Sequence, residues 1–168
     1  MTASDHQALP RWNVTDVHES LDARSFTDAL ELVGADVERL VVLFDELDIR
    51  STERSIEPAD GDKADRAIAE FNRVSDALNL LDAYVYSIVS TDSRHEHAQA
   101  VMSEINTTGS SLRPLLARLA DWVAALGADE IANVSAEARE HLGPLQRFAE
   151  RAAHQMPEAE EHLYAALS

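Results

Sequence analysis

Apolar residues recur through most of the chain at alternating spacings of four and three positions, the spacing of one helix face. The pattern runs through residues 26–47, returns over 64–88, and returns again over 98–126. Sustained period-two alternation, which marks a half-buried strand, is absent from the sequence. The sequence therefore predicts an all-α fold.

The predicted elements form a single helical domain over residues 1–168. An N-terminal strap over 1–24 precedes helices over residues 25–50, 62–90, 93–126, 135–154 and 157–168. Long helices with short connections favour an antiparallel bundle of three to four long helices, with shorter helices at the C-terminal end. The last helix stops at Ser168 without a cap or polar tail, so we expect the chain to be cut from a longer protein.

Short polar residues mark where helices are expected to begin, because their side-chain oxygens accept hydrogen bonds from free backbone N–H groups. Ser25, followed by Asp28, resembles a capping box. Ser135 is expected to begin the helix over 135–154. The other expected N-caps are Asp60 or Asp62 for the second helix and Asp92 or Ser93 for the third.

Glycine and proline indicate a bend in the third helix. Gly109 lies in its middle, where glycine costs about 1 kcal/mol relative to alanine. We therefore expect a bend there or the close approach of another helix, and Pro114 is expected to add a kink. Gly127 fits the position that follows a helix end.

Helices in the C-terminal third of the chain are expected to be interrupted more often than those before it. A short turn is predicted at residues 129–131, and Gly143-Pro144 is expected to interrupt the helix that Ser135 begins. Pro157 suits the first turn of the last helix, which carries Leu163, Tyr164 and Leu167 on one side.

The large aromatic residues indicate how the chain packs. Trp122 lies on the apolar face of the third helix and is expected in the core. Of Tyr84 and Tyr86, we expect one to pack in the core and the other to lie at its edge, although the pair could also line a groove. Trp12 is expected to pack against the bundle, which would make the first twenty residues an ordered strap.

Composition narrows the range of partners. The chain has 14 Lys and Arg against 31 Asp and Glu, a formal net charge of −17. This balance disfavours nucleic acid and anionic membranes as partners. The longest nearly unbroken apolar run, Trp122–Ala128, is far shorter than a membrane span. The first residues, Met1-Thr2-Ala3-Ser4-Asp5, lack the charged and apolar regions of a signal peptide. We therefore expect a soluble, cytoplasmic protein.

Self-repulsion should accompany so many carboxylates. Added salt screens like charges, so the melting temperature is expected to rise between low and molar NaCl. Calorimetry across that range tests this prediction, and a flat melting temperature would contradict it.

No sequence motif supplies a catalytic or metal site, and no residue of the chain is assigned to one. The absence of cysteine excludes a thiolate zinc site and a cysteine nucleophile. Gly-x-Ser-x-Gly, Gly-x-Gly-x-x-Gly and Gly-x-x-x-x-Gly-Lys do not occur. His95-Glu96-His97 is close to a zinc-peptidase motif, but its histidines are two positions apart and diverge on a helix. We interpret both as surface residues of a first helical turn.

The C-terminal third offers a weaker metal hypothesis. It holds three histidines and a glutamate-rich turn after Pro157, which we interpret as favourable charge at a helix N-terminus. A four-helix metal carrier would need inward Glu-x-x-His pairs, but Glu158–Glu161 and Glu137–Glu140 both end in glutamate. Metal analysis tests this alternative. The three histidines are His141, His154 and His162.

Three segments, taken in order, resemble the N-terminal region of oligoendopeptidase F-type, thimet oligopeptidase-like zinc metallopeptidases. The first is Pro10-Arg11-Trp12-Asn13-Val14-Thr15-Asp16-Val17, followed by Ser20-Leu21-Asp22. The second is Tyr84-Val85-Tyr86 with Ser90-Thr91-Asp92 and Ala98-Gln99-Ala100. The third runs from Leu145-Gln146-Arg147 through Pro157-Glu158 to Ser168. Together the three segments span nearly the whole chain.

The resemblance implies one wall of a substrate channel. In that family a helical N-terminal domain covers a zinc centre, whose His-Glu-x-x-His helix would lie beyond this sequence. The implied parent hydrolyses short peptides with zinc-activated water. The implied partners are its own C-terminal catalytic domain and short peptides, and this chain alone should be inactive and without zinc.

Two further expectations accompany this hypothesis. An apolar strip that the catalytic domain would cover is expected to be exposed, and a homodimer could form through it. The alternative function is a stand-alone, non-catalytic helical interaction module. Whether the reading frame continues past Ser168 into His-Glu-x-x-His distinguishes the two.

Overall fold

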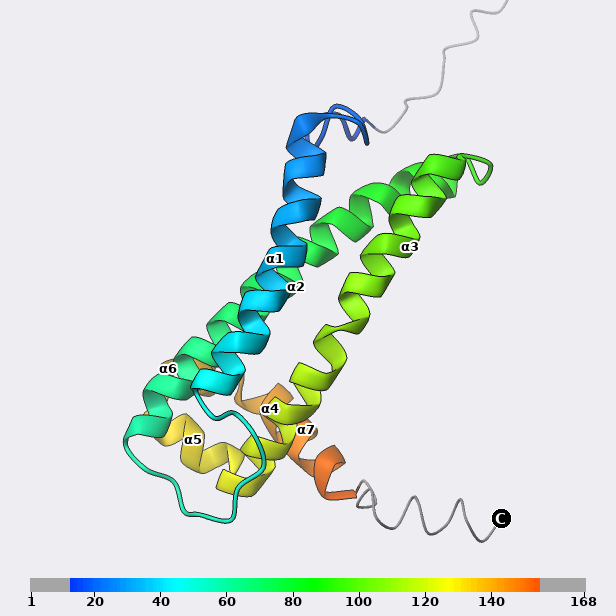
Figure 1. The fold of residues 1–168 in the computed structure, drawn as a ribbon. Helices are drawn as coiled ribbons and strands as arrows, with labels where there is room; N and C mark the ends of the chain where they lie inside the picture. The colour runs from blue at the N-terminus through cyan, green and yellow to red at the C-terminus, as the bar shows by residue number, and fades with distance from the viewer. Residues whose placement is uncertain (1–12, 155–168) are drawn as a thin grey trace, which may run out of the picture.

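The computed structural model describes residues 13–154, with side chains through residue 152. Within this range the chain is a bundle of α-helices without strands, which confirms the predicted all-α class (Figure 1). Trp12, His162 and the helix predicted over 157–168 lie outside the described residues, as does the side chain of His154. The helices are α1 (Arg24–Glu46), α2 (Ala59–Thr91), α3 (Glu96–Ser110), α4 (Leu112–Leu126), α5 (Ala128–Val134), α6 (Ala136–Glu140) and α7 (Leu142–His154).

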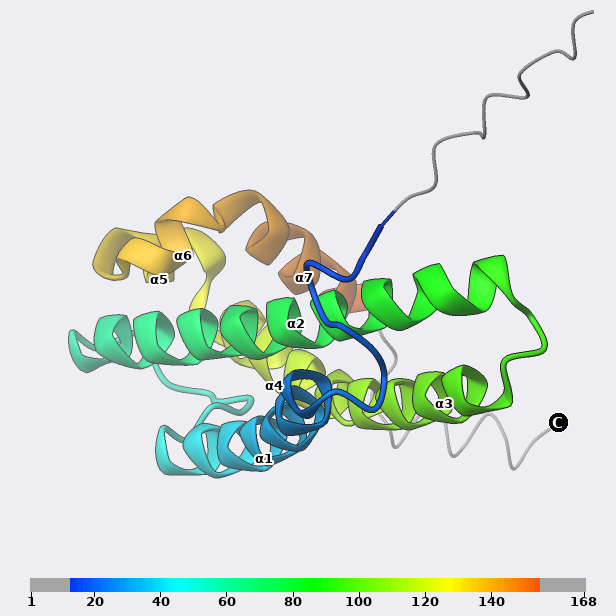
Figure 2. The same ribbon diagram turned by 90° about the horizontal axis from the view of Figure 1, so that it is seen from above.

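The longest helix, α2, is the axis of the molecule. Helices α1 and α3 pack along one side of it, and the short helices α5 and α6 cover the other side of its N-terminal half (Figure 2). Helix α4 pairs with α7 and brings the C-terminal part of the described chain onto the bundle. Helix α2 therefore contacts α1, α3, α5 and α6, and α4 and α7 join the bundle through these helices and through each other.

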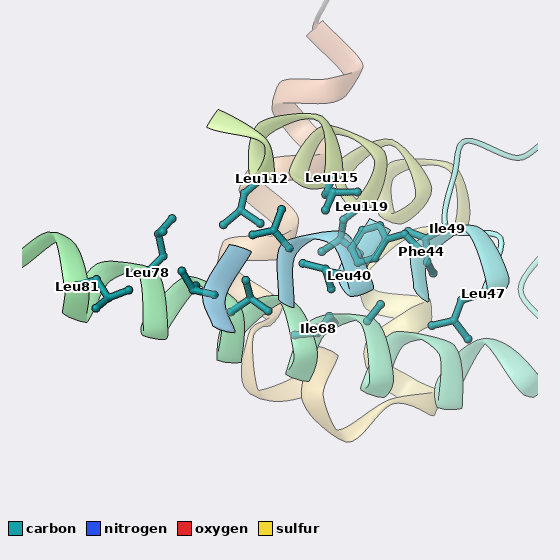
Figure 3. Close-up of a cluster of buried hydrophobic side chains, with 14 of the residues drawn as sticks. Leu40, Phe44, Leu47, Ile49, Ile68, Leu78, Leu81, Leu112, Leu115 and Leu119 are labelled. Carbon is teal, nitrogen blue, oxygen red and sulfur yellow. The ribbon is translucent and has the colours of Figure 1, made fainter. Parts of the chain in front are cut away.

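The apolar stripes predicted from the sequence meet in one core. Leu40 and Phe44 of α1, Ile68 of α2 and Leu119 of α4 point toward one another (Figure 3) and are almost completely buried. Burying side chains of this size contributes about 1.5–3 kcal/mol each. Trp122 is 1% exposed, which confirms its predicted place in the core.

Two prolines determine where helices break. The ring of a proline clashes with the carbonyl four residues earlier and removes one helical hydrogen bond. Helix α3 ends at Ser110, four residues before Pro114, and α6 ends at Glu140, four residues before Pro144. The bend predicted near Gly109 and Pro114 is confirmed, as a break at Ser111.

The predicted interruption at Gly143-Pro144 is placed wrongly. The break falls at His141, and Gly143 and Pro144 lie in the first turn of α7. Proline is tolerated there, because the first backbone N–H groups of a helix have no partner within it. The same reasoning explains why Pro114 lies in the first turn of α4.

Three of the predicted N-caps are wrong. Ala23, which has no capping side chain, precedes α1 in place of Ser25, and Pro58 precedes α2. Helix α3 is capped by His95, whose Nδ1 accepts a hydrogen bond from the Ala98 N–H at 3.1 Å. The polar residues that were expected there have other partners: the Asp92 carboxylate accepts the Arg94 N–H at 3.0 Å, and Asp60 binds an arginine described below.

The segment after α4 is more helical than the sequence indicated. Gly127 ends α4 with a φ of 91°, as predicted for glycine after a helix. The turn predicted at residues 129–131 is instead part of α5, which packs on α2 and α7. Ser135 is confirmed as an N-cap, since its Oγ accepts the Ala138 N–H at 2.9 Å.

Two glycines permit close approaches of α2 to its neighbours. A Cβ on Gly61 of α2 would lie 2.3 Å from the backbone oxygen of Val134, so α5 contacts the α2 backbone directly. A Cβ on Gly109 would lie 3.0 Å from Cδ2 of Leu78, which confirms the predicted close approach. Among the residues described, no helix is long and apolar enough to cross a membrane.

Candidate functional site

The strap, residues 13–23, crosses the C-terminal half of α2 at one end of the bundle. The hydroxyl of Tyr84 donates a hydrogen bond to the His18 carbonyl oxygen at 3.1 Å. Burial raises the pKa of the Tyr84 phenol, which keeps it a donor. Tyr84 is buried and Tyr86 is 63% exposed, so the prediction of one core and one peripheral tyrosine is confirmed.

An aromatic cluster holds the strap in place. The imidazole of His18 lies edge-on to the rings of Phe26 and Tyr84, with centroids 5.3 and 5.1 Å away. Its Nδ1 lies 3.2 Å from the Ser25 hydroxyl. Ser25, expected as a helix cap, therefore contacts the strap through its side chain. Edge-to-face pairs contribute about 0.5–1.5 kcal/mol beyond the area they bury.

A hollow of about 270 Å³ lies between the strap and the adjoining ends of α2 and α3. Glu19 and Asp22 supply carboxylates from the strap, and His95 and His97 supply imidazoles from the beginning of α3. Nδ1 of His97 lies 3.7 Å from an Asp22 carboxylate oxygen. This hollow, which we call the strap hollow, combines carboxylates, imidazoles and a phenol in one concave site. Its remaining lining is Val14, Thr15, Ser20, Leu21, Tyr84 and Ile88.

The strap hollow does not have the geometry of a zinc site. The rings of His95 and His97 are 6.4 Å apart at their centroids, and Nδ1 of His95 already accepts a backbone N–H. Over residues 13–152 no group of three or more His, Asp or Glu side chains could hold a metal ion. His97 is exposed as predicted, whereas His95 is half-buried as the helix cap. The hollow can offer hydrogen bonds and negative charge to a small polar or cationic group.

A second concave surface, which we call the α1–α2 groove, has an apolar floor. It encloses about 580 Å³, with Val42, Leu43 and Ala69 on its floor. Val42 is 55% exposed and adds apolar surface to the groove. Its rim is formed by Arg39, Glu46, Arg66 and Glu70.

Buried carboxylates occupy the N-terminal half of α2 and its neighbours. Asp60 accepts two hydrogen bonds from Arg54, each 2.7 Å long, and a third from the Glu57 N–H at 2.8 Å. Hydrogen bonding from Arg54 holds the Asp60 pKa below its usual value, against the opposing effect of burial. Asp60 is fully engaged, so it ties the 47–58 loop to α2 and is unavailable for chemistry.

Two further carboxylates link α2 to α6 and α1. Asp65 accepts the Ser135 hydroxyl at 2.6 Å and the Glu137 N–H at 3.0 Å, and the serine hydrogen bond lowers its pKa. Asp36 of α1 accepts Arg73 of α2 at 2.8 Å, which lowers the pKa of Asp36. Asp36 also pairs with Arg39, and Arg73 with Glu70.

The sequence analysis did not single out Asp36 or Asp65, although the sequence carries a signal for Asp36. Asp36 lies directly before Val37 on the apolar face of α1, three positions after Val33. A charge at such a position requires a partner, because burying it alone is costly. Searching each apolar stripe for an inward charge would have found Asp36.

His141, one of the candidate metal ligands, has structural partners. Its Nε2 lies 3.1 Å from the Asn72 side-chain nitrogen, and its Nδ1 lies 2.9 Å from the Glu137 carbonyl oxygen. It therefore joins the end of α6 to α2.

Comparison with protein-family models, curated proteins and solved structures found no match to this chain.

Proposed function

We propose that this chain is the N-terminal helical domain of an oligoendopeptidase F-type zinc metallopeptidase, which confines short peptides over a zinc centre in the following domain. Its own residues bind no zinc in this proposal. Its role is to supply a channel wall, and the strap hollow faces the peptide with hydrogen-bonding groups and carboxylates.

One observation supports this proposal more than any other. Two of the three segments that resemble the family are far apart in the sequence, yet they meet at one end of the bundle. The Tyr84 hydroxyl binds the His18 carbonyl at 3.1 Å, and residues from both segments line the strap hollow. Two matching segments that contact each other in the fold support the resemblance to the family more strongly than two matching segments that lie apart.

The first experiment is to read the coding DNA beyond codon 168. An in-frame His-Glu-x-x-His helix is expected, and a stop codon there would remove the peptidase role. The longer protein, if encoded, should cleave a fluorogenic peptide and lose that activity with a chelator. The isolated chain should not cleave the peptide, and chelator-sensitive cleavage by it would contradict the proposal.

The α1–α2 groove supports a second candidate function, that of a non-catalytic interaction module. Its apolar floor and the exposed Val42 are suited to a helix from another protein. Substituting Val42→Asp would weaken such an interaction without disturbing the core. In the peptidase proposal the same groove is a surface that the catalytic domain or a second copy could cover.

A further inference from the structure

The groove between α4 and α7 lies at the point where the described chain ends. Its floor is formed by the half-buried side chains of Leu116 and Phe148, and it encloses about 230 Å³. The described chain ends at His154, two residues after Ala152, which is part of the groove's lining. The last described residues therefore lie at the edge of this groove.

Arginines flank this groove although the chain as a whole is strongly acidic. Arg113 of α4 and Arg151 of α7 line it together with one acid, Asp121. The Arg151 guanidinium lies over the Phe148 ring, 5.0 Å from the centroid. Arg113 has no hydrogen bond or ion pair among the described residues. In a chain of net charge −17, a groove with two arginines and one acid selects acidic segments.

The residues that follow α7 have matching chemistry. Residues 155–168 contain three glutamates and no lysine or arginine. The glutamates come first and are followed by Leu163, Tyr164 and Leu167, which helical spacing places on one side. An acidic, amphipathic segment thus begins beside an apolar groove that has a basic rim.

We propose that residues 155–168 dock into the groove between α4 and α7. Leu163, Tyr164 and Leu167 contact its apolar floor, and the glutamates at 158, 160 and 161 face Arg113 and Arg151. The short connection gives the segment a high effective concentration at this site. This inference does not depend on the peptidase proposal, because it concerns contacts within one chain.

Hydrogen–deuterium exchange on the full chain tests the docking. Amides of residues 157–168 are expected to exchange at least tenfold more slowly than in an unstructured peptide. Arg113→Glu/Arg151→Glu should remove that protection. Arg66→Glu, a charge reversal on the α1–α2 groove, is the matched control and should leave it unchanged. Unprotected amides in the wild type, or protection that survives the double substitution, would overturn the proposal.

Cross-linking determines which chain supplies the segment. The protein has no cysteine, so any disulfide that forms must join two introduced cysteines. Cysteines at position 117 and at position 159 or 166 should form a disulfide within one chain. Cysteines at position 69 and at the same two positions are the control and should not. A disulfide that links two chains would overturn docking in cis in favour of a second copy, and equal rates at positions 69 and 117 would overturn a specific site.

Discussion

The two halves of α2 are held by different interactions. In the N-terminal half, Asp60, Asp65 and Arg73 are fixed by directional hydrogen bonds and ion pairs to three other segments. In the C-terminal half, no ion pair occurs among the described residues, and Tyr84 holds the strap by one hydrogen bond and ring contacts. Leu80 and Tyr86 of this half are more than half exposed.

We call the N-terminal half of α2, with its ion-paired residues Asp60 and Arg73, the fixed half, and the C-terminal half around Tyr84 the adaptable half. Buried charges require specific partners in a specific geometry, so they fix register and orientation at considerable cost if a partner is lost. Ring contacts and a single hydrogen bond constrain geometry less than a network of buried ion pairs does. The strap hollow lies beside the half of α2 that has no ion pair among the described residues.

Acid should cause the largest change, because it removes several anchors of the fixed half at once. Hydrogen bonds from Arg73, Arg54 and Ser135 lower the pKa values of Asp36, Asp60 and Asp65, respectively. Their stabilisation is therefore complete above the ordinary carboxyl pKa of about 4 and is lost as the pH falls through the lower folded-state values. Exchange measured between pH 6 and pH 3 should show the N-terminal half of α2 opening before the Tyr84 region, and the reverse order would contradict the comparison.

Removing a single anchor should cost somewhat less. Asp60→Ala leaves Arg54 without its carboxylate and the Glu57 N–H without an acceptor, and we expect a loss of about 3 kcal/mol in unfolding free energy. Asp62→Ala, an exposed carboxylate of the same turn, should change it by less than about 0.5 kcal/mol. Urea denaturation followed by circular dichroism compares the two variants.

A methyl group added at Gly61 tests the close contact between α2 and α5 in the fixed half. Gly61→Ala places a Cβ 2.3 Å from the Val134 backbone oxygen, so α5 must shift at a cost of about 2 kcal/mol. Gly34→Ala in α1 meets nothing within 4 Å and should instead stabilise the protein by about 0.5–1 kcal/mol, because alanine favours the helix. Thermal melts of the two variants should move in opposite directions.

The smallest effect is expected in the adaptable half. Tyr84→Phe removes the hydrogen bond to the His18 carbonyl and keeps the ring contacts, which should cost about 1 kcal/mol. Faster amide exchange should be confined to the strap, and Tyr86→Phe should have no effect. A global loss of stability in Tyr84→Phe would show that the strap is part of the rigid core.

The apolar pattern predicted the fold better than the polar residues predicted its details. Stripes on successive helices had to meet, since each buries one face, and Phe44 and Trp122 lie in the core as expected. Ser135 was predicted correctly as an N-cap, but two other predicted caps failed because a serine or aspartate near a helix start can find a better partner in another element. Asp60 does so with Arg54, and Ser25 with His18.

The candidate site depended on tertiary contacts that local patterns do not encode. The strap hollow requires residues 14–22 to lie against Tyr84 and His97, and no spacing rule places them there. Helix α5 was missed for a related reason. At seven residues it is too short to be stable alone, and contacts with α2 and α7 hold it.

The break that Pro114 imposes separates α3 from α4 at Ser111. Fifteen residues of helix, about 22 Å, lie between this break and the turn that carries His95 and His97. The buried side chains of Ala98, Val101 and Ile105 fix that length of helix on the bundle. The imidazoles of the strap hollow are therefore positioned by core packing along the whole of α3, and the proline break lies at its far end.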